Sequence, residues 1–109
     1  MTTPGNALNN EMMALLWATG KVSLMWRQNS RKIKLGGHLY TFGYKGCGDI
    51  CGMFKGGRHF QFEGKAGNDR ANQDQIDNMN QINNDGGLAA IIHSVDELRD
   101  LLIDEGYMK

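Results

Sequence analysis

The sequence predicts a single α/β domain, and three observations support this prediction. The chain has 109 residues, a length that fits one domain with one hydrophobic core. Apolar residues recur at helical spacing near both ends, whereas strand-like alternation and β-branched or aromatic runs fill the middle. Glycine pairs and short polar turns separate these segments, with no internal repeat between them. We therefore expect one domain over residues 1–109, in the order helix, several strands including a hairpin, helix, strand, helix.

The N-terminal part is expected to form one helix and then three short strands. Asn9 or Asn10 can cap a helix that starts at Glu11, because a short amide side chain accepts a hydrogen bond from a free backbone N–H. Gly20 is expected to end this helix. β-branched, aromatic and alternating residues indicate strands over 22–27, 31–35 and 38–42.

The C-terminal part is expected to form a hairpin, a helix, a strand and a last helix. Two strand-like runs, 50–54 and 59–65, flank a glycine pair that takes positive φ without strain, which is typical of a hairpin turn. Asn72 and Gln75 have the spacing of a helix N-cap and its third position, so a helix is expected from there to about Asn84. A wholly apolar strand over 88–92 and a capping box that begins at residue 94 follow.

The composition excludes several classes of protein. With 40% hydrophobic and 22% charged residues, the chain is typical of globular proteins and unlike a disordered one. Its longest apolar stretch is far below the roughly 18 residues of a membrane span, and residues 1–5 do not resemble a secretory signal. The two cysteines, Cys47 and Cys51, cannot form a disulfide framework. We therefore expect no membrane partner and a reduced, cytoplasmic setting.

The charges of the chain are segregated along the sequence. The formal net charge of the whole chain is zero, and this balance argues against a nucleic-acid binder, which usually carries an excess of positive charge. Residues 21–58, however, hold eight basic residues and one acidic residue, whereas residues 59–109 hold four basic and ten acidic residues. The two segments either pair across the fold, or the basic one faces a nucleic acid. In the second case, the DNA-binding candidates are Arg27, Arg31, Lys32, Lys34 and Lys45.

The strongest local signal is a strand that carries Glu63 and Lys65 on one face. Because side chains alternate along a strand, Phe60 and Phe62 are expected to be buried on the opposite face. A carboxylate can bind a hard cation such as Mg²⁺, and a neighbouring lysine can hold a water molecule or a phosphate oxygen. The alternative is an exposed strand face with a weak ion pair.

Asp49 adds a second carboxylate to this face. It is the only acidic residue within 21–58, and a hairpin with its turn near Gly56-Gly57 pairs positions whose numbers sum to about 113. Asp49 should then lie opposite residues 63–65. Two carboxylates and a lysine form the kind of divalent-metal site that supports phosphodiester hydrolysis. The alternative is a turn aspartate that caps loop amides.

Two further polar residues are candidates with open alternatives. Gln75 is in line with Met79 and Ile82, so it continues the inner stripe of its helix and is either a site residue or part of the helix cap. Glu11 is the only charged residue among the first twenty, and the dipole of the expected helix is sufficient to explain it.

Four segments carry a resemblance to a known family: Gly46-Cys47-Gly48-Asp49, Phe62-Glu63-Gly64-Lys65, Asp69-Arg70-Ala71-Asn72-Gln73-Asp74-Gln75 and Gly86-Gly87. In order and spacing the chain resembles, from Glu11 to about Leu102, the virus-type replication-repair nuclease (VRR-NUC) branch of the PD-(D/E)XK nucleases. It looks like a small stand-alone member of the phage or prophage type. The resemblance implies a restriction-endonuclease-like αβββαβ core, with a mixed central sheet flanked by helices.

The resemblance also implies an activity, a cofactor and partners. It implies Mg²⁺- or Mn²⁺-dependent cleavage of DNA, with no small-molecule organic cofactor. Similarity to Holliday-junction resolvases implies a homodimer that acts on branched DNA, in the cytoplasm of a bacterial host if the protein is phage-encoded. The implied roles are metal ligation by Asp49, Glu63 and the Gly64 carbonyl, positioning of water by Lys65, and completion of the site by Gln75 and Glu11. The alternative function is a non-catalytic DNA-binding module that uses the basic segment 21–58.

Two positions depart from the pattern of the family. Gly48 stands where the family usually has proline before the aspartate, and Gly64 stands where a branched apolar residue is usual. Neither departure removes a ligand. We expect a less rigid Asp49 loop and a smaller contribution of the second strand to the core.

Overall fold

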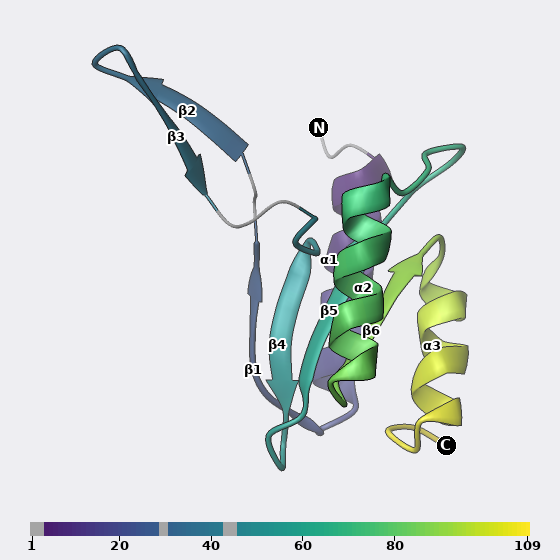
Figure 1. Ribbon diagram of the computed structural model, residues 1–109. Coiled ribbons are helices and arrows are strands. Elements are labelled where there is room, and N and C mark those ends of the chain that lie inside the picture. The colour runs from purple at the N-terminus through teal and green to yellow at the C-terminus, as the bar shows by residue number, and fades with distance from the viewer. Residues whose placement is uncertain (1–3, 29–30, 43–45) are drawn as a thin grey trace.

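A computed structural model describes residues 4–28, 31–42 and 46–109 of the chain (Figure 1). The fold is α/β, with a four-stranded mixed sheet flanked by helices. The elements are α1 (Pro4–Ala18), β1 (Val22–Arg27), β2 (Arg31–Leu35), β3 (His38–Phe42), β4 (Ile50–Phe54), β5 (His59–Gly64), α2 (Gln73–Asn84), β6 (Leu88–Ile92) and α3 (Val95–Asp104).

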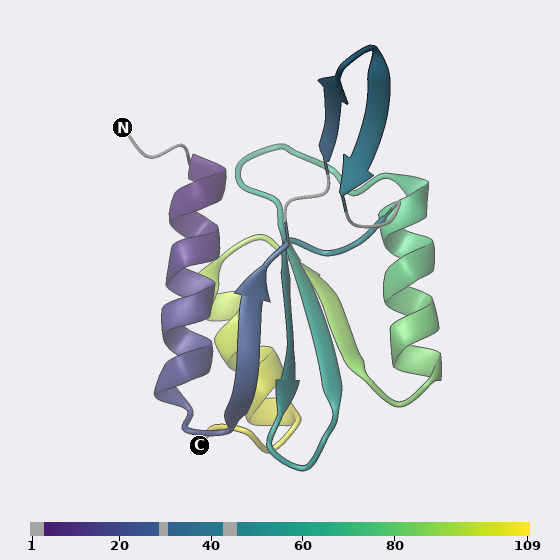
Figure 2. The same ribbon diagram turned by 90° about the vertical axis from the view of Figure 1, so that its left-hand side faces the viewer.

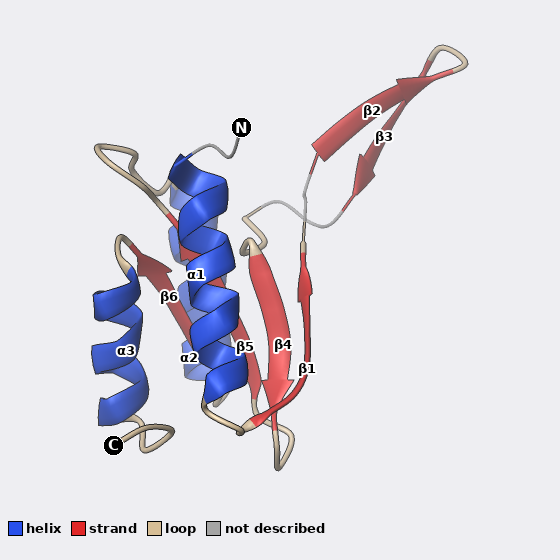
Figure 3. Cartoon of the chain, turned by 180° about the vertical axis from the view of Figure 1, so that it is seen from behind, coloured by secondary structure: helices blue, strands red, loops and turns tan. Residues whose placement is uncertain are grey.

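The main sheet has the strand order β1-β4-β5-β6. The pairs β1/β4 and β4/β5 are antiparallel, and β5/β6 is parallel, because the chain crosses over through α2 between these two strands. α1 and α3 pack on one face of the sheet and α2 on the other (Figure 2). The β2–β3 hairpin forms a second sheet that extends away from the main one (Figure 3).

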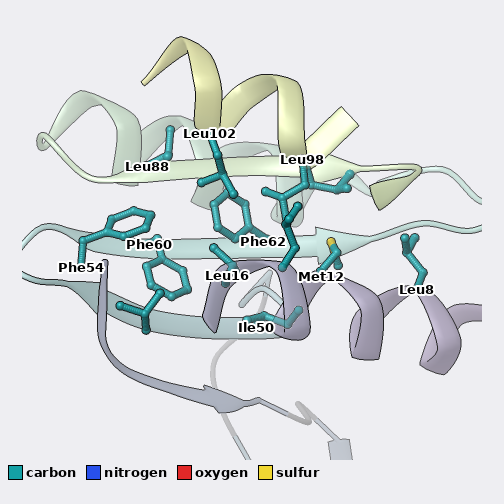
Figure 4. Close-up of a cluster of buried hydrophobic side chains, with 13 residues drawn as sticks. Leu8, Met12, Leu16, Ile50, Phe54, Phe60, Phe62, Leu88, Leu98 and Leu102 are labelled. Atoms are coloured by element: carbon teal, nitrogen blue, oxygen red, sulfur yellow. The ribbon is translucent and has the colours of Figure 1, made fainter. Parts of the chain in front are cut away.

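The core lies between the main sheet and the α1–α3 layer (Figure 4). Phe54, Phe60 and Phe62 are fully buried there, together with leucines from α1 and α3. The ring of Phe54 also stacks on Tyr107, with 3.8 Å between ring centroids, which fixes the C-terminal segment against the sheet. The predicted burial of Phe60 and Phe62 is confirmed.

All the predicted strands are present, but the predicted start of the first helix is wrong. α1 begins at Pro4, not at Glu11, and proline suits a first helical position because its missing N–H has no partner to lose there. Asn9 is therefore no cap. It is 4% exposed and lies within the helix beside Leu8 and Met12 on the buried face.

The expected hairpin and the expected cap of the second helix are both present. Ile50 pairs with Phe62, so paired positions sum to 112, close to the predicted value. Asn72 caps α2 with both halves of the capping box in place. At α3 only half of the expected box forms, because the Glu97 carboxylate contacts His93, while the Ser94 hydroxyl accepts the Glu97 N–H.

None of the helices in the described part of the chain is long and apolar enough to cross a membrane.

Candidate active site

The predicted site residues gather at one end of the main sheet, where the parallel strands β5 and β6 terminate. Asp49 directly precedes β4, Glu63 is near the end of β5, and Lys65 follows that strand. The N-terminal ends of all three helices lie at this same end of the molecule (Figure 1). Each contributes the positive end of its dipole, so this end is electrostatically suited to an anion such as phosphate.

Asp49 is held by groups from two elements. Its Oδ2 accepts the Gly64 N–H at 3.3 Å and the side-chain amide of Asn9 at 3.4 Å. The contact with Gly64 confirms the prediction that Asp49 lies opposite residues 63–65. The carboxylate is thus fixed from β5 on one side and from α1 on the other. It does not serve merely as a turn residue that caps its own loop.

Glu63 is a buried carboxylate, with only 4% of the residue exposed. Its Oε1 accepts a hydrogen bond from Gln75 Nε2 at 2.9 Å and lies 3.4 Å from Lys65 Nζ. Its Oε2 is buried and has no hydrogen-bond partner among the described residues. The alternative of an exposed strand face is therefore wrong, because α2 covers this face of the sheet.

The two carboxylates repel each other electrostatically. Burial and the neighbouring charge of Asp49 raise the pKa of Glu63 to about 7, although Lys65 acts in the opposite direction. The raised pKa means that the ionised form of Glu63 is destabilised, and an additional cation nearby would stabilise that form. Lys65 is itself mostly buried, with 18% of its side chain exposed.

Gln75 completes the helix cap, as one of its two alternatives predicted, and also contacts Glu63. Its Oε1 accepts the Asn72 N–H at 3.0 Å and completes the helix cap, while its Nε2 donates to Glu63. The cap therefore fixes which end of the amide faces the carboxylate. Because a backbone N–H can only donate, the Gln75 amide must present its NH₂ group to Glu63.

Asn9 is a site residue that the sequence interpretation missed. Its Nδ2 donates to Asp49, and its Oδ1 is buried without a hydrogen-bond partner in the described part of the chain. A Cβ atom on Gly64 would lie 2.6 Å from this Oδ1, so the absent side chain at Gly64 allows α1 to approach the strand. One signal was present in the sequence: Asn9 is three residues before Met12, on the same apolar stripe of the helix.

Glu11 is not brought together with the other site residues. It is exposed on α1, and two residues along an α-helix correspond to a rotation of about 200° away from the face that carries Asn9. The structure therefore places Asn9, and not Glu11, beside Asp49.

Gly48 has a structural role that proline could not fill. Its N–H donates to Gln61 Oε1 at 3.0 Å, and that oxygen also accepts a hydrogen bond from Asn78 of α2. Proline lacks this N–H. The Asp49 loop is thus tied to β5 and α2 through the buried Gln61, which sequence interpretation had not assigned to the site.

Of the basic candidates, Arg27 is the one whose side chain is described. It pairs in register with Ile50, so it lies next to Asp49 at the same end of the sheet. Its Nη2 donates to Asn6 at 3.3 Å, and its buried Nε has no hydrogen-bond partner among the described residues. Three other candidates lie on β2 (Arg31, Lys32 and Lys34), and Lys45 lies outside the described residues. Part of the basic segment does pair across the fold, since Arg58 lies 3.5 Å from Glu105.

The donor set fits a hard divalent cation. Carboxylate oxygens are among the ligands that Mg²⁺ and Mn²⁺ prefer, and the buried Glu63 Oε2 has no hydrogen-bond partner among the described residues. Within the described ranges no cluster of three or more His, Cys, Asp or Glu residues occurs, so acidic side chains would supply only part of a coordination shell. Mg²⁺ usually retains several water ligands, which is compatible with two carboxylates.

In comparisons with known proteins, no family model and no curated protein matches the chain. A function for this chain must therefore be inferred from the arrangement of its own residues.

Proposed function

We propose that the protein is a Mg²⁺- or Mn²⁺-dependent DNA endonuclease with a PD-(D/E)XK core of the VRR-NUC type. The observation that carries this proposal is the meeting of Asp49, the buried Glu63 and Lys65 at the end of β5. Glu63 is buried and the half-buried Asp49 lies close enough to raise its pKa, and such a pair of like charges destabilises a fold unless a cation such as a bound metal ion offsets it. In chain order, α1, the sheet strands β1, β4 and β5, the crossover helix α2 and the parallel strand β6 are compatible with the αβββαβ core that the resemblance implies.

Asp49 and Glu63 would hold the metal ion, with the Gly64 carbonyl as a further ligand. A bound ion of this kind lowers the pKa of water and offsets negative charge that develops on the phosphate. Lys65 Nζ, which lies 3.4 Å from Glu63 Oε1, would orient a water molecule or contact a phosphate oxygen. Gln75 and Asn9 act as positioning residues, because each donates a hydrogen bond to one of the two carboxylates.

DNA would approach the end of the sheet at which the helix N-termini gather. Arg27 lies beside Asp49 there, and the strand β2 carries Arg31, Lys32 and Lys34. Such a localised basic region would make binding depend strongly on salt even though the net charge of the chain is zero. Branched DNA as the preferred substrate, a homodimer as the active form and a cytoplasmic location are parts of the same proposal and derive from the resemblance.

The alternative is a DNA-binding module without catalysis. Such a module would use the basic residues and would not need a buried carboxylate at Glu63 with a second carboxylate beside it. It therefore predicts binding that is sensitive to salt but indifferent to divalent metal and to Asp49→Asn.

A cleavage assay with end-labelled linear, flapped and four-way DNA, in Mg²⁺ and in Mn²⁺, tests the proposal. We expect Lys65→Ala to lower the cleavage rate by about 100-fold or more, because it removes the cation beside Glu63. Lys55→Ala is the matched control, since Lys55 is exposed at the hairpin turn far from the site. Absence of cleavage of every DNA by the wild type, or equal cleavage by Lys65→Ala, would contradict the proposal.

A further inference from the structure

The two cysteines of the chain form a close pair that brackets Asp49. Cys47 Sγ and Cys51 Sγ lie 3.8 Å apart, and no other cysteine is present in the sequence. Both are buried, but Cys47 keeps 8% exposure whereas Cys51 has 2%. Metal ligation by this pair is disfavoured, because no third His, Cys, Asp or Glu joins it within the described ranges.

The two sulfur atoms differ in how firmly the fold holds them. Cys51 belongs to β4, whose backbone pairs with Trp26 on one side and with Gln61 on the other. Cys47 precedes the strand and has no strand partner on either side, although the neighbouring Gly46, with φ +84°, packs against the backbone carbonyl of Asp74. Any approach of the two sulfurs must therefore come mainly from the Cys47 side.

We propose that Cys47 and Cys51 are a modification site at which a two-electron oxidant such as hydrogen peroxide forms an intrachain disulfide. The Cys47 sulfur attacks the peroxide O–O bond, giving a sulfenic acid and one water molecule. The Cys51 thiol then displaces hydroxide from that sulfur and loses its proton, giving the disulfide and a second water molecule. The two thiols lose two electrons and two protons in total, and one peroxide is reduced.

Closure of the disulfide would displace the Asp49 loop. A disulfide bond is about 2.05 Å long, so the sulfurs must approach each other by about 1.8 Å from their present separation. The Gly48 N–H, which donates to Gln61, lies between the two cysteines, as does Asp49 itself. A shift of Cys47 therefore moves Asp49 away from its contacts with Gly64 and Asn9. This consequence for metal binding rests on the proposed nuclease function, whereas disulfide formation does not.

Thiol counting and intact-mass measurement after peroxide treatment test disulfide formation directly. We expect the folded wild type to lose both free thiols and the mass of two hydrogen atoms, with no disulfide between chains. Dithiothreitol should reverse both changes. Cys47→Ala should keep its single thiol free of any intrachain bond. A peptide map in which Cys47 and Cys51 are linked supports the site. Retention of two thiols, a stable sulfinic acid at Cys47, or disulfides only between chains would overturn it.

The effect on the site is measured on the same samples. We expect the oxidised wild type to show about tenfold weaker Mn²⁺ binding than the reduced form, by titration calorimetry, since the loop that positions a ligand has moved. Oxidant should leave Mn²⁺ binding by Cys47→Ala unchanged. Equal Mn²⁺ affinity of oxidised and reduced wild type would overturn displacement of Asp49. If neither form binds Mn²⁺, the proposed function fails while the mass and thiol results still decide the modification site.

Discussion

The side-chain amide of Asn9 and the carboxylate of Asp49, forty residues apart in the chain, lie 3.4 Å apart at the end of the main sheet. This contact ties α1 to the β4–β5 hairpin at the point where Asp49 also accepts the Gly64 N–H. Its presence depends on a helix that begins at Pro4, because only then is Asn9 inside the helix and turned toward the sheet.

Replacement of Asn9 should impair the site, whereas replacement of Glu11 should not. We expect Asn9→Ala to lower the cleavage rate and the apparent Mn²⁺ affinity by about 10- to 100-fold, because Asp49 loses the donor that orients it. Glu11→Ala should stay within about twofold of the wild type, since Glu11 is exposed on the opposite side of α1. Cleavage rates over a Mn²⁺ titration measure both variants. A larger loss in Glu11→Ala than in Asn9→Ala would contradict this assignment.

Glu63→Gln should stabilise the metal-free protein at high pH. The folded-state pKa of about 7 lies above the ordinary value of 4.5, so the folded state binds more protons than the unfolded state between these values. Stability is thus lost as the pH rises through this window, and the loss is complete above about 7. Urea unfolding with EDTA should show Glu63→Gln more stable than wild type by about 1–3 kcal/mol at pH 8.

The same comparison at low pH is the internal control for Glu63. The advantage of Glu63→Gln should shrink toward zero near pH 3.5, about one unit below the ordinary pKa of 4.5, where the wild-type carboxyl is mostly protonated in both states. Glu11→Gln, at an exposed position, should change the free energy of unfolding by less than about 0.5 kcal/mol at either pH. A Glu63→Gln variant that is less stable than wild type at pH 8 would refute the predicted repulsion.

Divalent metal should stabilise the wild type but not a variant that lacks one carboxylate. At a Mn²⁺ concentration 100 times its dissociation constant, the free energy of unfolding should rise by about 2.7 kcal/mol. Asp49→Asn should lose most of this gain. Thermal denaturation with and without Mn²⁺ measures the difference, and removal of the metal with EDTA should return both proteins to their starting melting temperatures. An equal metal-induced shift in Asp49→Asn would place the metal elsewhere.

Gly64→Ala should destabilise the fold through α1. The new Cβ would lie 2.6 Å from Asn9 Oδ1 and 3.0 Å from Met12 Cε, so the helix must move away, at a cost of about 1–3 kcal/mol. Gly5→Ala is the matched control, because its Cβ meets nothing within 4 Å. Urea unfolding should show a smaller penalty for Gly64→Ala when Asn9 is already alanine. Additive effects of the two changes would argue against the close contact.

Local patterns were sufficient to predict most of the fold and the centre of the site. The Gly56-Gly57 turn determines the hairpin register, and this register brings Asp49 opposite the end of β5. The spacing of Asn72 and Gln75 predicts the cap of α2. In each case the interacting residues are close in sequence or are aligned by a short turn, so periodicity and turn chemistry are enough.

Contacts between distant elements could not be predicted in the same way. Asn9 was interpreted as a helix cap because asparagine favours that position, whereas tertiary packing against Gly64 places it inside the helix. The role of Gln61, which ties the Gly48 N–H to Asn78 of α2, depends on how α2 packs over the sheet. Such packing leaves no periodic signal in the sequence.

Single-turnover cleavage of an end-labelled four-way DNA junction with Mn²⁺, by wild type and by Asp49→Asn, distinguishes a metal-dependent nuclease from a DNA-binding module without catalysis. Circular dichroism first establishes that the variant is folded. We predict that the wild type cuts the junction only when the metal is present, and that Asp49→Asn still binds the junction but cuts it at least about 100-fold more slowly. Cleavage by both proteins at the same rate, or binding without any metal-dependent cleavage by the wild type, would contradict the account.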